Sequence, residues 1–264
     1  MQQRLALGVE YDGAAFAGWQ AQRGLRTVEG ELERAISAVA DHPVELVCGG
    51  RTDAGVHALG QVVHFDTTAQ RSLRAWLLGV NSNLPPDVSI AWVRPVPGWF
   101  HARFSATRRS YRYLVLNREA RCALLAGRAT WVRRPLDVAA MQAAADQLLG
   151  EHDFSSFRAS ECQSRSPVRR VDELRVERDA DRVAIEVCAN AFLHHMVRNI
   201  AGFLIEVGGG NLPPGRAAGL LAARDRRIAP PTAPAEGLYL REVEYPAAFL
   251  LPRAGEWSAA RDPL

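Results

Sequence analysis

The residues best suited to chemistry lie in one glycine-rich stretch, Gly49 to Gly60, which places an arginine, an aspartate and a histidine among four glycines in twelve residues. Glycines let a loop bend tightly and let its backbone approach a ligand closely. Asp53 is the only carboxylate of the stretch, so it is the first candidate for a catalytic group. The alternative is a long hairpin connection in which Asp53 hydrogen-bonds its own turn and Arg51 is a solvated charge.

Arg198 is a second unusual residue, because it lies in the strongly apolar run 192–207, where we expect a helix. A charge inside an apolar helix is costly unless it is paired. The partner is either a structural carboxylate or Asp53, which the arginine would hold in its ionised form. The sequence alone does not choose between them.

The histidines indicate no metal site. His194 and His195 are adjacent, so on a helix they diverge, whereas a two-histidine helical site needs a spacing of three or four. His57 follows Asp53 by four residues and is either a second acid or base or a residue that hydrogen-bonds within the loop.

Two tyrosines begin a predicted strand in an arginine-rich part of the chain. Tyr111 and Tyr113 share one face of that strand and Arg112 takes the other. Core packing is the interpretation we favour for Tyr113. The ring of Tyr111 can equally stack on a nucleobase.

The elements that must hold these residues follow from hydrophobic periodicity. Strands are expected at 5–11, 44–48, 61–66 and 88–93, and helices at 28–39, capped by Thr27, and at 72–80. The first of these strands alternates apolar and polar residues, as a half-buried strand does. The glycine-rich stretch joins the second strand to the third. The order is β-α-β-β-α-β.

The second half of the chain repeats this order without repeating the sequence. Strands are expected at 111–116, 168–178, 183–188 and 238–243, an extended piece at 129–133, and helices at 136–149, 192–207 and 215–224. We therefore predict an α+β protein of two β-α-β-β-α-β (RRM-like) units whose antiparallel sheets join around a central cleft. The predicted domains are 1–105, which carries the Asp53 loop, and 106–245, which completes the cleft; a tail of unknown role follows at 246–264.

Composition indicates an ordinary globular protein. The 264 residues are 48% hydrophobic and 23% charged. No apolar run at the N-terminus is long enough for a signal peptide or a membrane span, so a cytoplasmic location is expected. Cys48, Cys122, Cys162 and Cys188 are too scattered for a redox pair or a zinc site, and we expect buried, reduced thiols.

The basic residues are unevenly distributed. All 32 are arginines, which excludes lysine-dependent chemistry such as a Schiff base or a P-loop. The stretch 101–134 carries nine arginines and only Glu119, whereas acids outnumber arginines on both sides of it. Such a concentration favours a polyanionic partner, and nucleic acid is the first candidate.

Several blocks resemble one known family. GRTDAGVHA, residues 50–58, resembles the signature loop of the TruA family of tRNA pseudouridine synthases residue for residue. Further blocks similar to the family's motifs recur in family order between about residues 5 and 245: 11–13 with Phe16 and 18–20, 101–106, 111–113, 152–154 with Phe157, 192–199 and 232–238.

The resemblance implies a site and an activity. Asp53 would be the catalytic aspartate, Tyr111 the ring on the target uracil, and Arg198 the partner of the aspartate. A homodimer would isomerise uridine to pseudouridine at positions 38, 39 and 40 in the anticodon stem-loop of tRNA, one tRNA contacting both subunits. The N1–C1′ bond breaks and the uracil rejoins through C5, so neither a cofactor nor a metal is expected. The residues expected to face phosphates are Arg51, Arg103, Arg108, Arg109 and Arg112.

Other functions are less well supported by the sequence. A non-catalytic RNA-binding protein with two RRM-like domains would need an RNP1-like run, which is missing, and would leave the Asp53 loop without a purpose. A metal-dependent hydrolase of a small acidic substrate would need ligand spacings that are missing. The sequence leaves open which uridine is preferred and whether Asp53 attacks C1′, removes the C2′ proton or adds to C6.

Overall fold

The computed structural model describes residues 2–257. These residues form two compact units, the first made of residues 2–108 and 239–257 and the second of residues 109–238. The sequence placed the boundary at 105/106 and ended the second domain at 245; the structure instead groups the last strand with the first unit.

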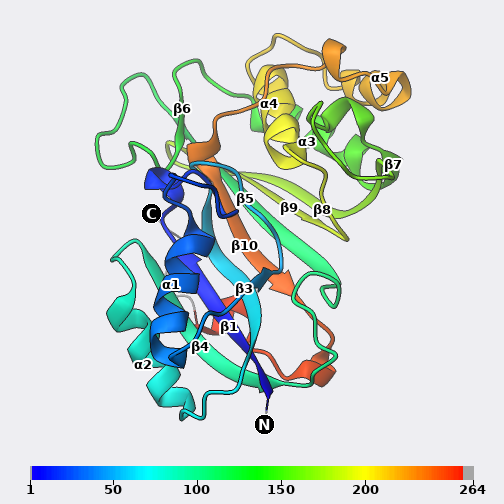
Figure 1. The fold of residues 1–264 in the computed structure, drawn as a ribbon. Coiled ribbons are helices and arrows are strands. Elements are labelled where there is room, and N and C mark those ends of the chain that lie inside the picture. Colours follow the sequence, from blue (N-terminus) through cyan, green and yellow to red (C-terminus); the bar gives the residue numbers. More distant parts are fainter. Residues whose placement is uncertain (1, 258–264) are drawn as a thin grey trace. The chain divides into compact units, whose positions relative to one another are not determined.

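The first unit contains the predicted β-α-β-β-α-β series. Its elements are β1 (Gln3–Tyr11), α1 (Val28–Ala40), β2 (Val47–Cys48), β3 (His57–Thr67), α2 (Leu73–Asn83) and β4 (Val88–Val96). β1 is the central strand and pairs antiparallel with β3 and β4. The other edge of β3 pairs antiparallel with β2 and parallel with β10 (Leu238–Glu244), so this sheet is mixed rather than purely antiparallel. Helices α1 and α2 lie on one face of the sheet (Figure 1).

The core of the first unit explains these elements. Thr27 caps α1 through a bond from the amide of Gly30, and Val28, Leu32 and Ile36 of its apolar stripe are buried. β1 is buried on both faces rather than half-buried. The indole of Trp92 covers Gly8 on β1, and Trp257 of α6 (Ala254–Trp257) packs edge-on against Trp92 with ring centroids 6.4 Å apart. Part of the predicted tail therefore packs on this sheet.

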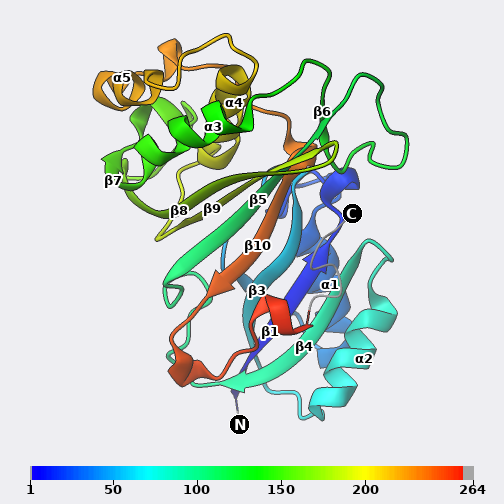
Figure 2. The same ribbon diagram turned by 180° about the vertical axis from the view of Figure 1, so that it is seen from behind.

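The second unit contains a sheet with helices on one face (Figure 2). Its elements are β5 (Arg108–Asn117), β6 (Thr130–Val132), α3 (Val138–Ala145), β7 (Gly150–Asp153), β8 (Val168–Asp179), β9 (Arg182–Ala189), α4 (Met196–Gly208) and α5 (Arg216–Ala223). β5, β9, β8 and β7 pair antiparallel in that order, and β6 pairs parallel with β5. Large rings fill the core, among them Tyr113, Phe154, Phe157 and Phe203.

Two predicted helices are shorter than expected. α4 begins at Met196, not at 192, because His195 adopts a left-handed φ of 60° immediately before it. α3 ends at Ala145 and continues as one turn of 3-10 helix, after which Gly150, with φ +92°, begins the unpredicted strand β7. The short 3-10 helices are Gly13–Ala15, Asp146–Leu148, Ser155–Phe157, Arg226–Ile228, Ala235–Gly237 and Ala247–Phe249.

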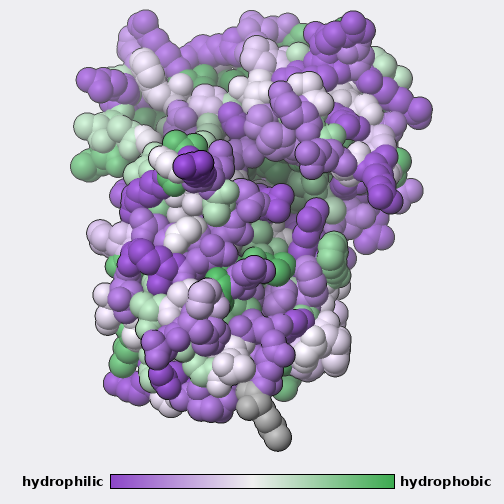
Figure 3. Space-filling view, in the orientation of Figure 1, coloured by the Kyte–Doolittle hydropathy of each residue, from purple (hydrophilic) through white to green (hydrophobic). Residues whose placement is uncertain are grey.

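The surface is mostly hydrophilic on the face shown in Figure 3, with small hydrophobic areas between the polar side chains. Within residues 2–257, no helix combines the length and the hydropathy that crossing a bilayer requires. Cys48 and Cys188 are buried as expected, whereas Cys122 and Cys162 are partly exposed.

Candidate active-site loop

The glycine-rich stretch connects β2 to β3 through residues 49–56, and side chains from neighbouring strands hold its backbone. The amide of Gly50 donates to Oε1 of Gln61 at 3.2 Å, and the Gln61 side chain donates back to the Gly50 carbonyl. The hydroxyls of Thr52 and Tyr11 share a buried hydrogen bond of 2.7 Å. The loop is thus fixed on the N-terminal side of Asp53 although it has no regular structure.

The segment that follows β1 packs directly against the same loop. The amide of Trp19 donates to the Thr52 carbonyl at 3.0 Å. Gly18 has φ +97°, and a Cβ at this position would lie 3.0 Å from the Thr52 oxygen and 3.1 Å from the carbonyl carbon of Asp53. Only glycine combines this φ with so close an approach. Two separate sequence blocks therefore form one local structure around the aspartate.

Asp53 opens a tight turn in this frame. The amide of Val56 donates to the Asp53 carbonyl at 3.2 Å, and Gly55 in the turn has φ +78°. The Asp53 side chain is neither fully buried nor fully exposed. Because the backbone is fixed on both sides, the point from which the carboxylate projects is fixed, which suits a catalytic group.

His57 is buried behind the loop and supports its structure. Its Nδ1 accepts the amide of Gly13 at 3.0 Å, and its ring stacks on Tyr239 with centroids 4.6 Å apart. Asp12 Oδ1 lies 3.1 Å from the same Nδ1. The Gly13 amide can donate to this Nδ1 only when Nδ1 carries no proton, and Asp12 forms an ion pair with the ring only when the ring is protonated. The contacts match the loop hydrogen-bonding role considered for His57.

Cys48 is the other nucleophilic side chain beside the loop, and its chemistry is blocked. Burial raises the pKa of its thiol to about 12. A thiol needs its thiolate form to act as a nucleophile, and this one remains protonated at neutral pH. Asp53 therefore stays the candidate in this part of the first unit.

In the second unit, the two tyrosines of β5 occupy one face of the strand. Tyr113 is fully buried, with its hydroxyl 2.6 Å from Thr130 Oγ1 and 2.8 Å from the Pro234 carbonyl, and burial raises its pKa. The core role expected for Tyr113 is confirmed. Tyr111 packs against the edge of Phe192, with ring centroids 5.0 Å apart at 82°. Its aromatic neighbour fixes the plane of its ring.

Arg198 lies in the first turn of α4, not in the helix interior as the sequence suggested. Its Nε donates to the carbonyl of Ala233 at 2.9 Å, and the Ala233 amide donates to the Arg198 carbonyl at 3.1 Å. Beside it, Asn199 accepts the hydroxyl of Thr232 at 2.7 Å. These bonds join the blocks 192–199 and 232–238 and position the guanidinium.

The predicted phosphate-facing arginines divide between the units. Arg51, Arg103 and Arg108 are exposed residues of the first unit. Arg109 and Arg112 lie on β5 in the second unit, where Arg112 pairs with Glu186 at 2.6 Å, so a phosphate would compete with that carboxylate. Asp53 and Arg198 also belong to different units, and their pairing stays a prediction.

The sequence reasoning missed two residues that shape the loop, Thr52 and Gln61. Gln61 has no exposed surface although it is polar and lies within the apolar strand β3. Buried amides need partners, so a glutamine in an apolar strand next to a glycine-rich loop was the available signal. Thr52 gave no comparable signal, because its partner Tyr11 is distant in the sequence.

Comparisons with known proteins agree with the resemblance. A family model described as tRNA pseudouridine synthase matches residues 8–105 and 144–246. Proteins named tRNA pseudouridine synthase A from Methylococcus capsulatus, Coxiella burnetii and Cronobacter sakazakii are 58%, 57% and 54% identical to this chain. Each match covers 95% of this chain and, in the same order, 92%, 96% and 93% of the relative.

Two solved structures show a weak similarity. One, titled as the archaeal box H/ACA sRNP Nop10-Cbf5 complex, matches over 76% of this chain and 44% of the solved chain, with 14% identity and a TM-score of 0.36. The family model and the close relatives decide the assignment. With the aspartate loop in place and identity above one half over nearly its whole length, this chain belongs to the tRNA pseudouridine synthase A family.

Proposed function

We propose that this protein is an isomerase that converts uridine to pseudouridine at positions 38, 39 and 40 in the anticodon stem-loop of tRNA, with Asp53 as the catalytic carboxylate. The naming of the close relatives supports a synthase that acts on tRNA. The single structural observation that carries the proposal is the Asp53 loop, because its backbone is fixed by Gln61, Thr52 and the segment that contains Gly18.

The chemistry follows from the residues in these positions. The N1–C1′ bond breaks, the uracil turns, and C5 replaces N1 at C1′ while the C5 proton leaves. Attack on C1′, removal of the C2′ proton and addition to C6 all require an ionised Asp53. A pairing with Arg198 would maintain this ionisation when the substrate excludes water. Tyr111 would replace the stacking that the target base loses when it leaves the helix.

The proposed partner is tRNA, held as a polyanion. The exposed Arg51, Arg103 and Arg108, together with Arg109 and Arg112, would contact phosphates. We further propose that the protein works in the cytoplasm as a homodimer. Sedimentation of the protein with and without tRNA tests the dimer, and a monomer in both would contradict it.

The alternative of a non-catalytic RNA-binding protein has no support from the relatives, which are named as synthases. The names of the relatives do not support a metal-dependent hydrolase either, although the rings of His194 and His195 lie 4.0 Å apart and do not diverge as the sequence predicted. Full tritium release in the presence of a chelator, with tRNA that has been freed of divalent ions, would exclude a metal-dependent hydrolase.

The decisive experiment is tritium release from C5-labelled uridine in unmodified tRNA, because only bond formation at C5 expels that label. We expect release by the wild type and none by Asp53→Asn, with tRNA binding retained. Asp41→Asn, the same chemical change at the exposed end of α1, is the matched control and should behave as the wild type. Equal release by both variants would remove Asp53 from the mechanism.

A second variant tests the proposed ion pair. Arg198→Ala should reduce turnover by at least tenfold while tRNA affinity changes little. Because Arg198 also bonds Ala233, its thermal midpoint must be measured alongside. Wild-type turnover in a folded Arg198→Ala protein would exclude the pairing.

A further inference from the structure

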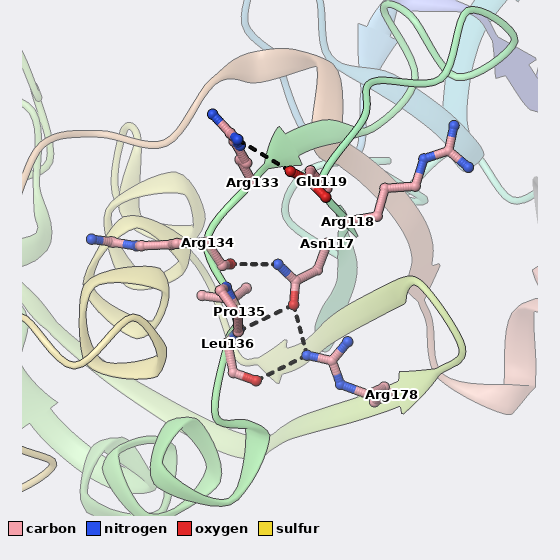
Figure 4. Close-up of a pocket in the computed structure, with 8 residues that line it drawn as sticks. All are labelled: Asn117, Arg118, Glu119, Arg133, Arg134, Pro135, Leu136 and Arg178. Atoms are coloured by element: carbon pink, nitrogen blue, oxygen red, sulfur yellow. Dashed lines mark hydrogen bonds and ion pairs between the residues drawn. The ribbon is translucent and has the colours of Figure 1, made fainter.

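A basic pocket in the second unit contains none of the residues assigned above. It has a volume of about 830 Å³ and opens where β5 and β6 end (Figure 4). Four arginines line it and only one acid, Glu119: Arg118, Arg133, Arg134 and Arg178. Three of these arginines belong to the basic stretch of the sequence, which the active site uses only in part.

Asn117 builds the frame of this pocket from a buried position. Its Nδ2 donates to the carbonyls of Val132 at 2.9 Å and Arg134 at 2.7 Å, and its Oδ1 accepts the amide of Leu136 at 3.1 Å. The same Oδ1 accepts NH2 of Arg178 at 2.8 Å. One side chain thus joins the end of β5, the segment after β6 and the end of β8, so the pocket is a fixed feature.

Arg178 is held in place without a counter-charge. Its other bonds go to the carbonyls of Leu136 at 2.9 Å and Ala180 at 3.4 Å, which are neutral oxygens. Among residues 2–257, no carboxylate lies within ion-pair distance of its guanidinium. A positioned guanidinium whose hydrogen bonds all go to neutral acceptors keeps its full charge available to an anion.

The neighbouring arginines differ in how far their charge is neutralised. Arg134 is paired with Glu206 at 2.8 Å. Arg133 contacts Glu119 at 3.2 Å, but both side chains are largely exposed, and such pairs are weak enough for a phosphate to replace the carboxylate. Arg118 has Asp181 only at 3.8 Å. In Figure 4 the side chains of Arg118 and Arg133 point away from that of Arg178, so the three arginines present their charges to different parts of an anionic backbone.

An aromatic ring stands beside these charges. In β6, Thr130 points into the core and Trp131 points outward, 44% exposed. The indole N–H donates to the carbonyl of Arg118 at 3.0 Å, which fixes the ring next to the pocket. Arginines around an exposed, anchored aromatic ring are the combination that binds a nucleotide through its phosphate and its base.

We propose that this pocket binds neighbouring backbone phosphates of the tRNA through Arg118, Arg133 and Arg178, while Trp131 stacks on an adjacent unpaired base. The proposal rests on the proposed function only in naming tRNA as the partner. It adds a contact that serves affinity and makes no contribution to the chemistry at Asp53.

The test compares charge removal inside the pocket with charge removal on the same strand outside it. The double variant Arg118→Gln/Arg178→Gln is expected to raise the Kd for unmodified tRNA about tenfold and to lower the slope of log K against log salt by about two, one for each lost phosphate contact. kcat/KM should fall by the same factor. Arg175→Gln, on the opposite face of β8, is the control and should bind as the wild type.

A second variant guards against misfolding, since Arg178 also bonds Leu136. Arg133→Gln/Trp131→Ala leaves the bonds of Asn117 intact and should weaken tRNA binding by a similar factor, with an unchanged thermal midpoint. Wild-type tRNA affinity in both double variants would overturn the proposal.

A further arm separates RNA from small anions. If equilibrium dialysis shows inorganic phosphate bound by the wild type and lost in the double variants while tRNA affinity is unchanged, the pocket is a small-anion site and the RNA assignment is wrong. Failure of the proposed function would appear differently, as absence of tritium release in the wild type, and would leave these binding results intact.

Discussion

Gly18 offers a sharp test of whether the frame around Asp53 matters for catalysis. Alanine at this position introduces a Cβ at φ +97°, which costs about 1–2 kcal/mol of folding free energy from backbone strain alone. The new Cβ would also lie 3.0 Å from the Thr52 carbonyl oxygen and 3.1 Å from the carbonyl carbon of Asp53. Both distances are shorter than ordinary contact, so the loop must shift by a few tenths of an ångström.

The expected loss of activity follows from the size of that shift. A displacement of about 1 Å in a catalytic group reduces the rate about a hundredfold. A few tenths of an ångström at Asp53 should therefore reduce kcat by roughly five- to tenfold. The affinity for tRNA should stay close to that of the wild type, because the exposed arginines are unaffected.

Gly24 provides the matched control. It also has a positive φ, +78°, but a Cβ there would meet nothing within 4 Å. Gly24→Ala should therefore lose about 1 kcal/mol of stability and no activity. The assay is single-turnover tritium release at saturating enzyme, with unfolding in urea measured on both variants. If Gly18→Ala turns over as fast as Gly24→Ala, the fixed loop is not what positions the carboxylate.

Three further predictions follow from the buried groups of the first unit. Gln61→Leu removes the side chain that hydrogen-bonds both backbone groups of Gly50, so the free energy of unfolding in urea should fall by about 2–4 kcal/mol and turnover should fall as well. An unchanged urea midpoint would show that Gln61 does not hold the loop. Burial, aided by Arg4, lowers the pKa of His64 to about 4. The unfolded chain then binds the extra proton, so stability should decline by up to about 3 kcal/mol as pH falls from about 6.5 to about 4, and a pH series should show a flatter profile for His64→Gln. Cys48→Ala should retain activity in the tritium assay, and a large loss in a folded variant would mean that the thiol takes part.

The first unit could be predicted well because its signals are local. The stripe of α1, the cap at Thr27 and the strand pattern of β1 each depend on residues close together in the sequence, although the alternation of β1 wrongly predicted a half-buried strand. The start of α4 could not be predicted from its apolar run. The helix starts only after His195, because this residue has a left-handed φ that is not helical. The hydrophobic pattern is the same on both sides of His195, so it does not reveal where the helix begins.

The position of β10 could not be predicted for a different reason. Its residues give an ordinary strand pattern, but its partner is β3, through the parallel pairs of Tyr239 with His57 and Leu240 with Ala58. More than two thirds of the chain separates these residues, and periodicity carries no information about which distant strand is the neighbour. Counting elements in order therefore placed the strand in the wrong unit.

The same distinction between local and distant information governs the candidate site. Asp53 was predicted to be the reactive group from one twelve-residue stretch, and the structure adds why that stretch is stiff. Gln61 of β3 and the segment after β1 bond its backbone, and Tyr11 of β1 bonds the side chain of Thr52. A catalytic carboxylate needs both a fixed position and a counter-charge. The first property is built entirely within one unit, by Gln61 and Gly18 among others, whereas the proposed counter-charge, Arg198, comes from the other. The fixed position and the ionisation of Asp53 should therefore be lost in different variants. Gly18→Ala should lower kcat without altering its pH profile. Arg198→Ala should displace the pH profile of kcat to higher pH, because the carboxylate becomes harder to ionise.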